Sequence, residues 1–192
     1  MVFSYLKIGV CTAAINNQKR FLGKNILVLS GERAEESTNR ANYREMEPDP
    51  ADRRDGTTKA RRYVDRARPI HKWTEKQVWD IIEKYGVNPH PAYKMGWGRL
   101  SCMCCIFGSN NQWASVKAVA PEKFEKISAY EKEFGFTIQR EKSVEEMAAK
   151  GTSYTFSQDL AGKSQKHDYT DPAIVSEWSL PLGAFGESVG PT

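Results

Sequence analysis

The sequence has no long hydrophobic run: no apolar stretch approaches the roughly 18 residues of a membrane-spanning helix. The first ten residues lack the basic segment, the apolar stretch and the small-residue cleavage site of a secretory leader. A cytoplasmic location is therefore expected. Histidine is scarce, with three residues, and cysteine is limited to four. In a reducing cytoplasm, cysteines are more often metal ligands or redox groups than structural disulfides.

A strong net charge is also absent, because 28 basic residues face 24 acidic ones and leave a formal net charge of +4. The distribution is uneven, since the segment 53–68 holds a clear excess of basic residues over two aspartates. Its basic members are Arg53, Arg54, Lys59, Arg61, Arg62, Arg66 and Arg68. Such an excess suggests a polyanionic ligand, either a nucleotide or a nucleic acid, and a solvated basic loop is the alternative.

One short apolar run, residues 25–30, is typical of a buried strand of a parallel sheet. Charged residues follow it at once, where open α/β sheets bind ligands. Arg33 and Arg40 offer planar donor groups suited to phosphate or sulfate oxygens, and Glu36 could hold one of these arginines in place. An ordinary helix start with surface charges is the alternative.

Helix signals appear later in the chain. Thr74 and Gln77 form a capping box before an apolar stripe that ends at Gly86. Further helices are predicted over residues 121–134 and 144–150, and each is closed by a glycine. Ser143 and Glu146 form a second capping box at the start of the latter helix. Residues 45–58 are predicted to form a long polar loop. The tail from Thr152 shows no clear periodicity, and its last twenty residues are expected to lie over the surface or to be loosely ordered.

Three cysteines lie within four positions: Cys102, Cys104 and Cys105. A metal ion or iron–sulfur cluster held here would need a fourth ligand, for which Cys11 is the remaining cysteine. The histidines that could replace it are His71, His90 and His167. A redox dithiol would need only Cys102 and Cys105, and a set of small buried thiols is the third possibility. Taken alone, His71 is more often a structural residue than a ligand.

Together these segments resemble the phosphoadenosine phosphosulfate reductase family of the adenine-nucleotide alpha-hydrolase-like superfamily. The resemblance covers about residues 4–115 and keeps the order of the family's motifs. The matching segments are residues 6–8, 30–40, 68–73 with 78–82, 88–93 and 98–106, which include the Cys102-x-x-Cys105 pair. The nearest resemblance is to phage and bacterial reductase-like proteins and to the sulfur-handling component of DNA phosphorothioation systems.

Two family features are not found in the sequence. The Ser-Gly-Gly-x-Asp-Ser nucleotide loop is missing, and no cysteine follows Cys105 to act as the family's C-terminal nucleophile. The chain is therefore expected to correspond to the C-terminal part of a family member, or to a trimmed relative. It should lack reductase activity by itself, expose an apolar sheet edge, and associate with a partner or with itself.

The resemblance implies an α/β fold with a partial Rossmann-like parallel sheet and a helical, cysteine-bearing C-terminal region. Residues 1–120 would form the family domain, and residues 121–192 a helical extension with a tail. The implied function is the handling of an adenosine phosphosulfate-type nucleotide in reductive sulfur transfer or sulfur mobilisation. Arg33, Glu36, Arg40 and Arg68 would bind this substrate. The cysteines would hold a [4Fe–4S] cluster, with zinc as the alternative.

A non-catalytic, metal-stapled module of a DNA-modification or phage complex is the competing interpretation. In that case exposed aromatic residues, such as Trp97 and Trp113, would contact a nucleic-acid backbone together with the basic residues.

Overall fold

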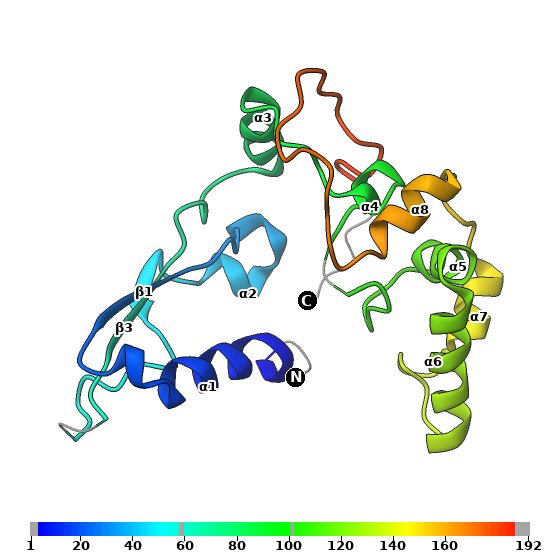
Figure 1. Ribbon diagram of the computed structural model, residues 1–192. Helices are drawn as coiled ribbons and strands as arrows, with labels where there is room; N and C mark the ends of the chain where they lie inside the picture. The colour runs from blue at the N-terminus through cyan, green and yellow to red at the C-terminus, as the bar shows by residue number, and fades with distance from the viewer. Residues whose placement is uncertain (1–3, 58–59, 101, 187–192) are drawn as a thin grey trace. The chain divides into compact units, whose positions relative to one another are not determined.

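The computed structural model describes residues 4–57, 60–100 and 102–186. The chain divides into two compact units (Figure 1), one reaching to Thr74 and the other beginning at Glu75, and each is described by itself. The division into residues 1–120 and 121–192, which rests on sequence alone, stays a prediction.

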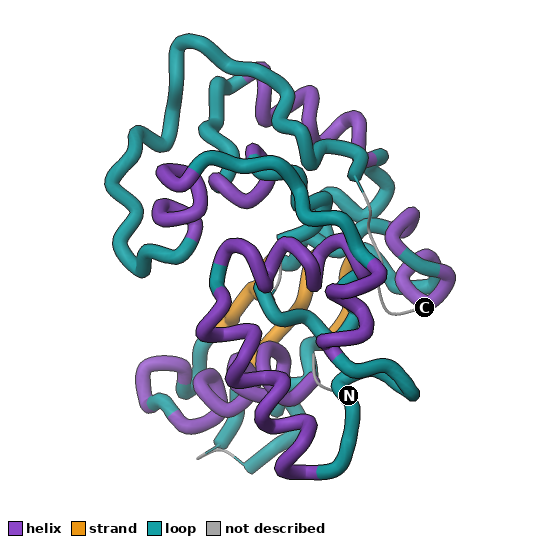
Figure 2. Tube along the Cα trace, turned by 90° about the vertical axis from the view of Figure 1, so that its right-hand side faces the viewer, coloured by secondary structure: helices purple, strands orange, loops and turns teal. Residues whose placement is uncertain are grey.

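The first unit is built on a small sheet with short helices around it. Its helices are η1 (Ser4–Gly9), α1 (Val10–Asn17), η2 (Lys19–Phe21), η3 (Ala34–Glu36) and α2 (Thr38–Ala41), and its strands are β1 (Asn25–Leu29), β2 (Met46–Pro48) and β3 (Tyr63–Ala67). The strand order is β1-β3-β2, with the three strands drawn in orange in Figure 2. β1 runs parallel to β3 and β2 runs antiparallel to it. The fold is α/β as predicted, but the sheet is mixed rather than wholly parallel.

One face of this sheet is packed and the other is open. Ile26 and Val28 of β1 lie against a small core formed by Ile15 of α1 and Val64 of β3. The alternate residues Leu27 and Leu29 are 56% and 66% exposed. The strand was correctly predicted, but the prediction that it is a buried strand was wrong, because its alternate side chains are exposed. A continuous apolar run gave no sign that only every second side chain packs inward.

The polar segment 45–58 is not the structureless loop that its composition suggested; Thr58 itself lies outside the described residues. The segment contributes β2 and then a turn at Asp49. The Asp49 carboxylate is 4% exposed, accepts from the Ala51 amide at 2.8 Å, and forms an ion pair with Arg66 at 2.7 Å. A buried aspartate with both a backbone and a guanidinium partner fixes this segment onto β3.

The second unit is helical. Its helices are α3 (Glu75–Lys84), α4 (Pro91–Lys94), α5 (Asn110–Val119), α6 (Pro121–Phe134), α7 (Val144–Lys150) and α8 (Gln158–Ser164). The predicted helices over α3, α6 and α7 are confirmed. Ser143 and Glu146 form a complete capping box, and Gly135 ends α6 with φ +66°. None of the described helices is long and apolar enough to cross a membrane.

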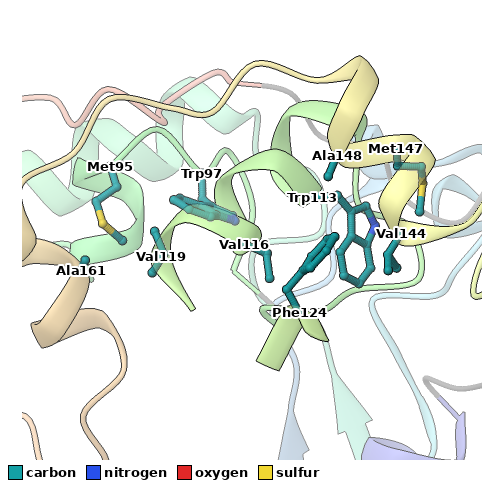
Figure 3. Packing of buried hydrophobic residues seen from close by; sticks show 10 residues of the cluster. All are labelled: Met95, Trp97, Trp113, Val116, Val119, Phe124, Val144, Met147, Ala148 and Ala161. Atoms are coloured by element: carbon teal, nitrogen blue, oxygen red, sulfur yellow. The ribbon is translucent and has the colours of Figure 1, made fainter. Parts of the chain in front are cut away.

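The core of this unit gathers around Trp113 and Met147, between α5, α6 and α7 (Figure 3). It also contains Met95, Trp97, Val116, Val119, Phe124, Val144, Ala148 and Ala161. α5 supplies much of it, yet the sequence did not predict this helix. Its buried residues include the polar Gln112 and Ser115, so no clean apolar stripe marks it.

The C-terminal segment is held more firmly than predicted. It contributes α8 and then returns along the start of the unit, where the Val175 amide donates to the Gly86 carbonyl at 2.8 Å. The Gly183 amide donates to the Tyr93 carbonyl, also at 2.8 Å. Residues 187–192 lie outside the described residues.

Candidate functional site

The edge of the sheet at which the sequence predicts a ligand lies in the first unit. β1 and β3 are parallel and end in register at Leu29 and Ala67. The Ser30 amide then donates to the Ala67 carbonyl at 3.0 Å. The segments that follow the two strands, residues 30–40 and 68–73, therefore leave the same edge of the sheet, which is the carboxyl end of its parallel pair.

A group of four charged side chains occupies this edge, and we call Arg33, Glu35, Glu36 and Arg40 the strand-end cluster. The Glu36 carboxylate accepts from the Arg40 guanidinium, and its other oxygen lies 3.6 Å from Arg33 Nε. Arg33 also pairs with Glu35. Glu36 thus holds both arginines, where the sequence suggested that it could hold one.

Local backbone structure explains this arrangement. Ser37 caps α2 by accepting from the Arg40 amide at 3.2 Å, which starts a helical turn directly after η3. Glu36 and Arg40 are therefore four residues apart across a turn, the spacing at which helical side chains meet.

Arg68 is placed differently from the other predicted substrate-binding residues. Its side chain is 4% exposed and is surrounded by protein groups. Its nitrogens contact Glu32 at 2.5 Å, Glu47 at 2.8 Å and the Arg44 carbonyl at 2.7 Å. The ring of Tyr43 lies 4.7 Å from the guanidinium carbon. Arg68 therefore joins β2, β3 and the segment after β1.

Glu32 was missed as a site residue, although it lies inside the segment that the sequence singled out. Partial burial raises the pKa of Glu32, but the hydrogen bond and positive charge of Arg68 outweigh it and bring the pKa below its ordinary value. The carboxylate is thus ionised at neutral pH and fixes Arg68.

Most arginines of the basic segment 53–68 are also engaged inside the unit. Arg66 pairs with Asp49, and Arg54 pairs with Asp52 and Asp65 at 2.7 and 2.6 Å. Arg62, 5% exposed, donates to backbone carbonyls. Lys59 lies outside the described residues. The excess of basic residues therefore serves largely to hold β2, β3 and the intervening turn together.

The three clustered cysteines lie in the second unit, in two consecutive turns before α5. Cys102 is exposed, whereas Cys104 and Cys105 are half-buried. Cys104 packs against the core, and this burial raises the pKa of its thiol, an effect that Lys123 partly offsets. Ser101, which belongs to the same motif, lies outside the described residues.

The three clustered cysteines do not form a complete metal site by themselves in the described residues. The described residues include all four cysteines and all three histidines, and no group of three or more Cys, His, Asp or Glu among them could hold a metal ion. Cys11 lies in α1, in the other unit. The cluster with Cys102, Cys104, Cys105 and Cys11, and its zinc alternative, stay predictions.

Comparison with known protein families shows which family the chain belongs to. A phosphoadenosine phosphosulfate reductase domain matches residues 10–107, just over half of the chain. The chain belongs to this family. The matched region of this reductase-family chain contains both the strand-end cluster and the cysteine turns, so the resemblance seen in the sequence is confirmed.

A phage protein is similar to the same reductase-family chain. It is an uncharacterized 37.8 kDa protein in the gpa 5′ region of Escherichia phage 186, 31% identical over 107 residues. The match covers 56% of this chain and 30% of the phage protein. No solved structure matches.

The aromatic residues expected to contact nucleic acid are buried instead. Trp97 is 6% exposed and Trp113 is 1% exposed, and both belong to the core of the second unit. The Trp97 ring meets Tyr154 edge to face, with ring centroids 5.1 Å apart. The expectation that these two exposed rings contact a nucleic-acid backbone was wrong, because both are buried in the core of the second unit.

The family's Asn-Pro-x-Pro-x-Tyr segment starts α4. His90 caps this helix, since its Nδ1 accepts from the Ala92 amide at 3.2 Å, and its ring stacks near Tyr169. Partial burial lowers the pKa of His90. An Nδ1 that accepts a hydrogen bond must be unprotonated, so the cap requires the neutral ring.

We expect this cap to make the second unit sensitive to mild acid. Because the pKa of His90 is lowered on folding, the unfolded chain binds the proton more readily. The contribution of the neutral ring is present above the ordinary histidine pKa of about 6.5 and is lost as pH falls through the lower folded value. Chemical denaturation at pH 7.5, 6.5 and 5.5 should show that the free energy of unfolding decreases as the pH is lowered.

His90→Asn is the matched control for this pH dependence. Asparagine is also a good capping residue, and it does not titrate in this range. The difference in stability between the wild type and His90→Asn should therefore change over the pH series. A difference that stays constant from pH 7.5 to 5.5 would show that His90 does not titrate with folding.

Proposed function

We propose that this chain binds an adenosine phosphosulfate-type nucleotide at the strand-end cluster and serves reductive sulfur transfer or sulfur mobilisation. Membership of the phosphoadenosine phosphosulfate reductase family supports the class of ligand. The matched residues cover only 30% of the phage relative, so the activity of a complete protein is part of the proposal. The proposal involves no reaction step on an iron–sulfur cluster.

The observation that carries the proposal is the pairing of two guanidinium groups with carboxylates at the carboxyl end of β1. Carboxylate, sulfate and phosphate oxygens present similar acceptors to a guanidinium group. In the free protein, Glu35 and Glu36 occupy Arg33 and Arg40. A bound sulfate or phosphate would take over donors that Glu35 now uses.

The four predicted substrate-binding residues then divide by role. Arg33 and Arg40 would contact the anion, and Glu36 would hold them in register. Arg68 would act through Glu32, as a positioning residue, because its guanidinium is surrounded by Glu32, Glu47 and the Arg44 carbonyl.

Calorimetric titration with adenosine 5′-phosphosulfate tests the proposal. Arg33→Ala should weaken binding by about 1.5–3 kcal/mol, the range for a hydrogen bond to a charged group. Arg20→Ala is the control, because Arg20 belongs to the same unit but lies in η2, before the amino end of β1. Equal affinities of the wild type and Arg33→Ala, with the fold intact, would remove the cluster from the binding site.

A second substitution should strengthen binding. Glu35 neutralises Arg33 and, with a side chain 42% exposed, competes with an incoming anion. Glu35→Gln removes that competition, and a surface ion pair of about 0.2–1 kcal/mol corresponds to a gain of up to about fivefold in affinity. Weaker binding by Glu35→Gln in the same titration would show that Glu35 supports the site rather than blocking it.

A further inference from the structure

A tight turn after β3 brings a buried histidine to the strand-end cluster. The Arg68 amide donates to the Glu45 carbonyl at 2.8 Å, and Pro69 and Ile70 then form a turn in which the His71 amide donates to the Arg68 carbonyl at 3.1 Å. Proline favours such a turn because its φ is already set. The result is a His71 that is 6% exposed.

His71 contacts the segment after β1 at two points. Its carbonyl accepts from the Ala34 amide at 2.8 Å, next to Arg33. Its Nε2 lies 2.8 Å from the Arg40 carbonyl. The two contacts hold both ends of the strand-end cluster against the turn that follows β3.

The chemistry of the second contact fixes the state of the ring. A carbonyl oxygen only accepts hydrogen bonds, so Nε2 must carry the proton and donate it. The same carbonyl also accepts from the Tyr43 amide at 3.0 Å, at the end of α2. The histidine therefore adds a donor to an exposed helix end and fixes the backbone of Arg40.

We propose that His71 is a positioning residue that holds Arg33 and Arg40 in place for the anion. This inference rests on the proposed function, since the anion is the ligand of the strand-end cluster. His71 does not touch the ligand in this account. Its ring acts through the Arg40 backbone, and its carbonyl acts through the Ala34 amide.

The geometry of the ring allows a test by rescue. The side-chain amide of glutamine can donate from nearly the place of Nε2, whereas the shorter asparagine reaches only about the place of Nδ1. His71→Ala should weaken binding of adenosine 5′-phosphosulfate about three- to tenfold, as expected for one lost hydrogen bond. His71→Gln should recover most of this loss, and His71→Asn should not. His167→Ala, at an exposed histidine of the other unit, should bind like the wild type.

A ligand-free measurement separates this inference from the proposed function. Nitrogen-15 NMR of the wild-type ring should show the tautomer with the proton on Nε2, and hydrogen exchange over residues 34–41 should be faster in His71→Ala than in His71→Gln. If Nε2 carries the proton and the two variants differ in exchange as predicted, but the wild type binds no nucleotide, the proposed function fails and the positioning contact stands. An Nε2 without a proton, or a His71→Gln variant no better than His71→Ala, overturns the role of His71.

Discussion

Replacing Asp49 with alanine is expected to destabilise the first unit by about 3–5 kcal/mol, the cost of leaving one member of a buried ion pair without its partner. The carboxylate contacts Arg66 through both Nε and Nη2, at 2.8 and 2.7 Å, and both side chains are buried. Domains are stable by only about 5–15 kcal/mol, so this loss should remove a large part of the unit's free energy of unfolding. Denaturant titration followed by circular dichroism measures it.

An exposed ion pair of the same unit provides the comparison. Lys72 and Glu45 are paired, but their side chains are 79% and 54% exposed. Glu45→Ala should therefore have a far smaller effect than Asp49→Ala. Asp49→Asn should fall between the two, because its side-chain oxygen can still accept from the Ala51 amide. Equal losses for Asp49→Ala and Glu45→Ala would contradict the account of β2 and its turn.

Replacing Trp113 with alanine is expected to cost about 3–5 kcal/mol in the second unit. The side chain is 1% exposed and meets Phe124 of α6 edge to face, with ring centroids 6.3 Å apart. It also belongs to the cluster that includes Val144 and Met147 of α7. Removal of the indole would leave a cavity among three helices, and thermal unfolding of the variant should have a lower midpoint than that of the wild type.

Trp113→Phe is the matched variant for this prediction. It keeps an aromatic ring in the core and removes the indole N–H, which is buried without a hydrogen-bond partner in the described residues. Its loss of stability should be clearly smaller than that of Trp113→Ala. If Trp113→Ala unfolded like the wild type but lost affinity for nucleic acid, Trp113 would be a surface contact and the packing described above would be wrong.

The sequence predicted helices best where the signals were local. The cap at Ser143 and the closing Gly135 need only a few neighbouring residues, and both ends are found where predicted. The sequence did not predict α5, because this helix is surrounded by other helices and buries Gln112 and Ser115 with its apolar residues. The sequence did not predict β2, because a three-residue strand containing Pro48 has almost no hydrophobic pattern of its own.

At the candidate site, the sequence identified the charged residues but not the partners of Arg68. Arg33, Glu36 and Arg40 are close in the chain, so their contact could be anticipated. Arg68 depends on Glu47 of another strand and on Glu32, 36 residues earlier, and these contacts follow from strand order rather than from spacing. For the same reason His71 could be recognised as a structural residue but not connected with Arg40.

Hydrogen–deuterium exchange with and without adenosine 5′-phosphosulfate tests the central claim most directly, because it locates the ligand on the chain. At saturating nucleotide, we predict slower exchange in residues 31–43 and 68–73, and no such change in Arg33→Ala under the same conditions. Unchanged exchange in both segments, with protection elsewhere or no binding at millimolar nucleotide, would contradict the assignment of the strand-end cluster as the sulfonucleotide site.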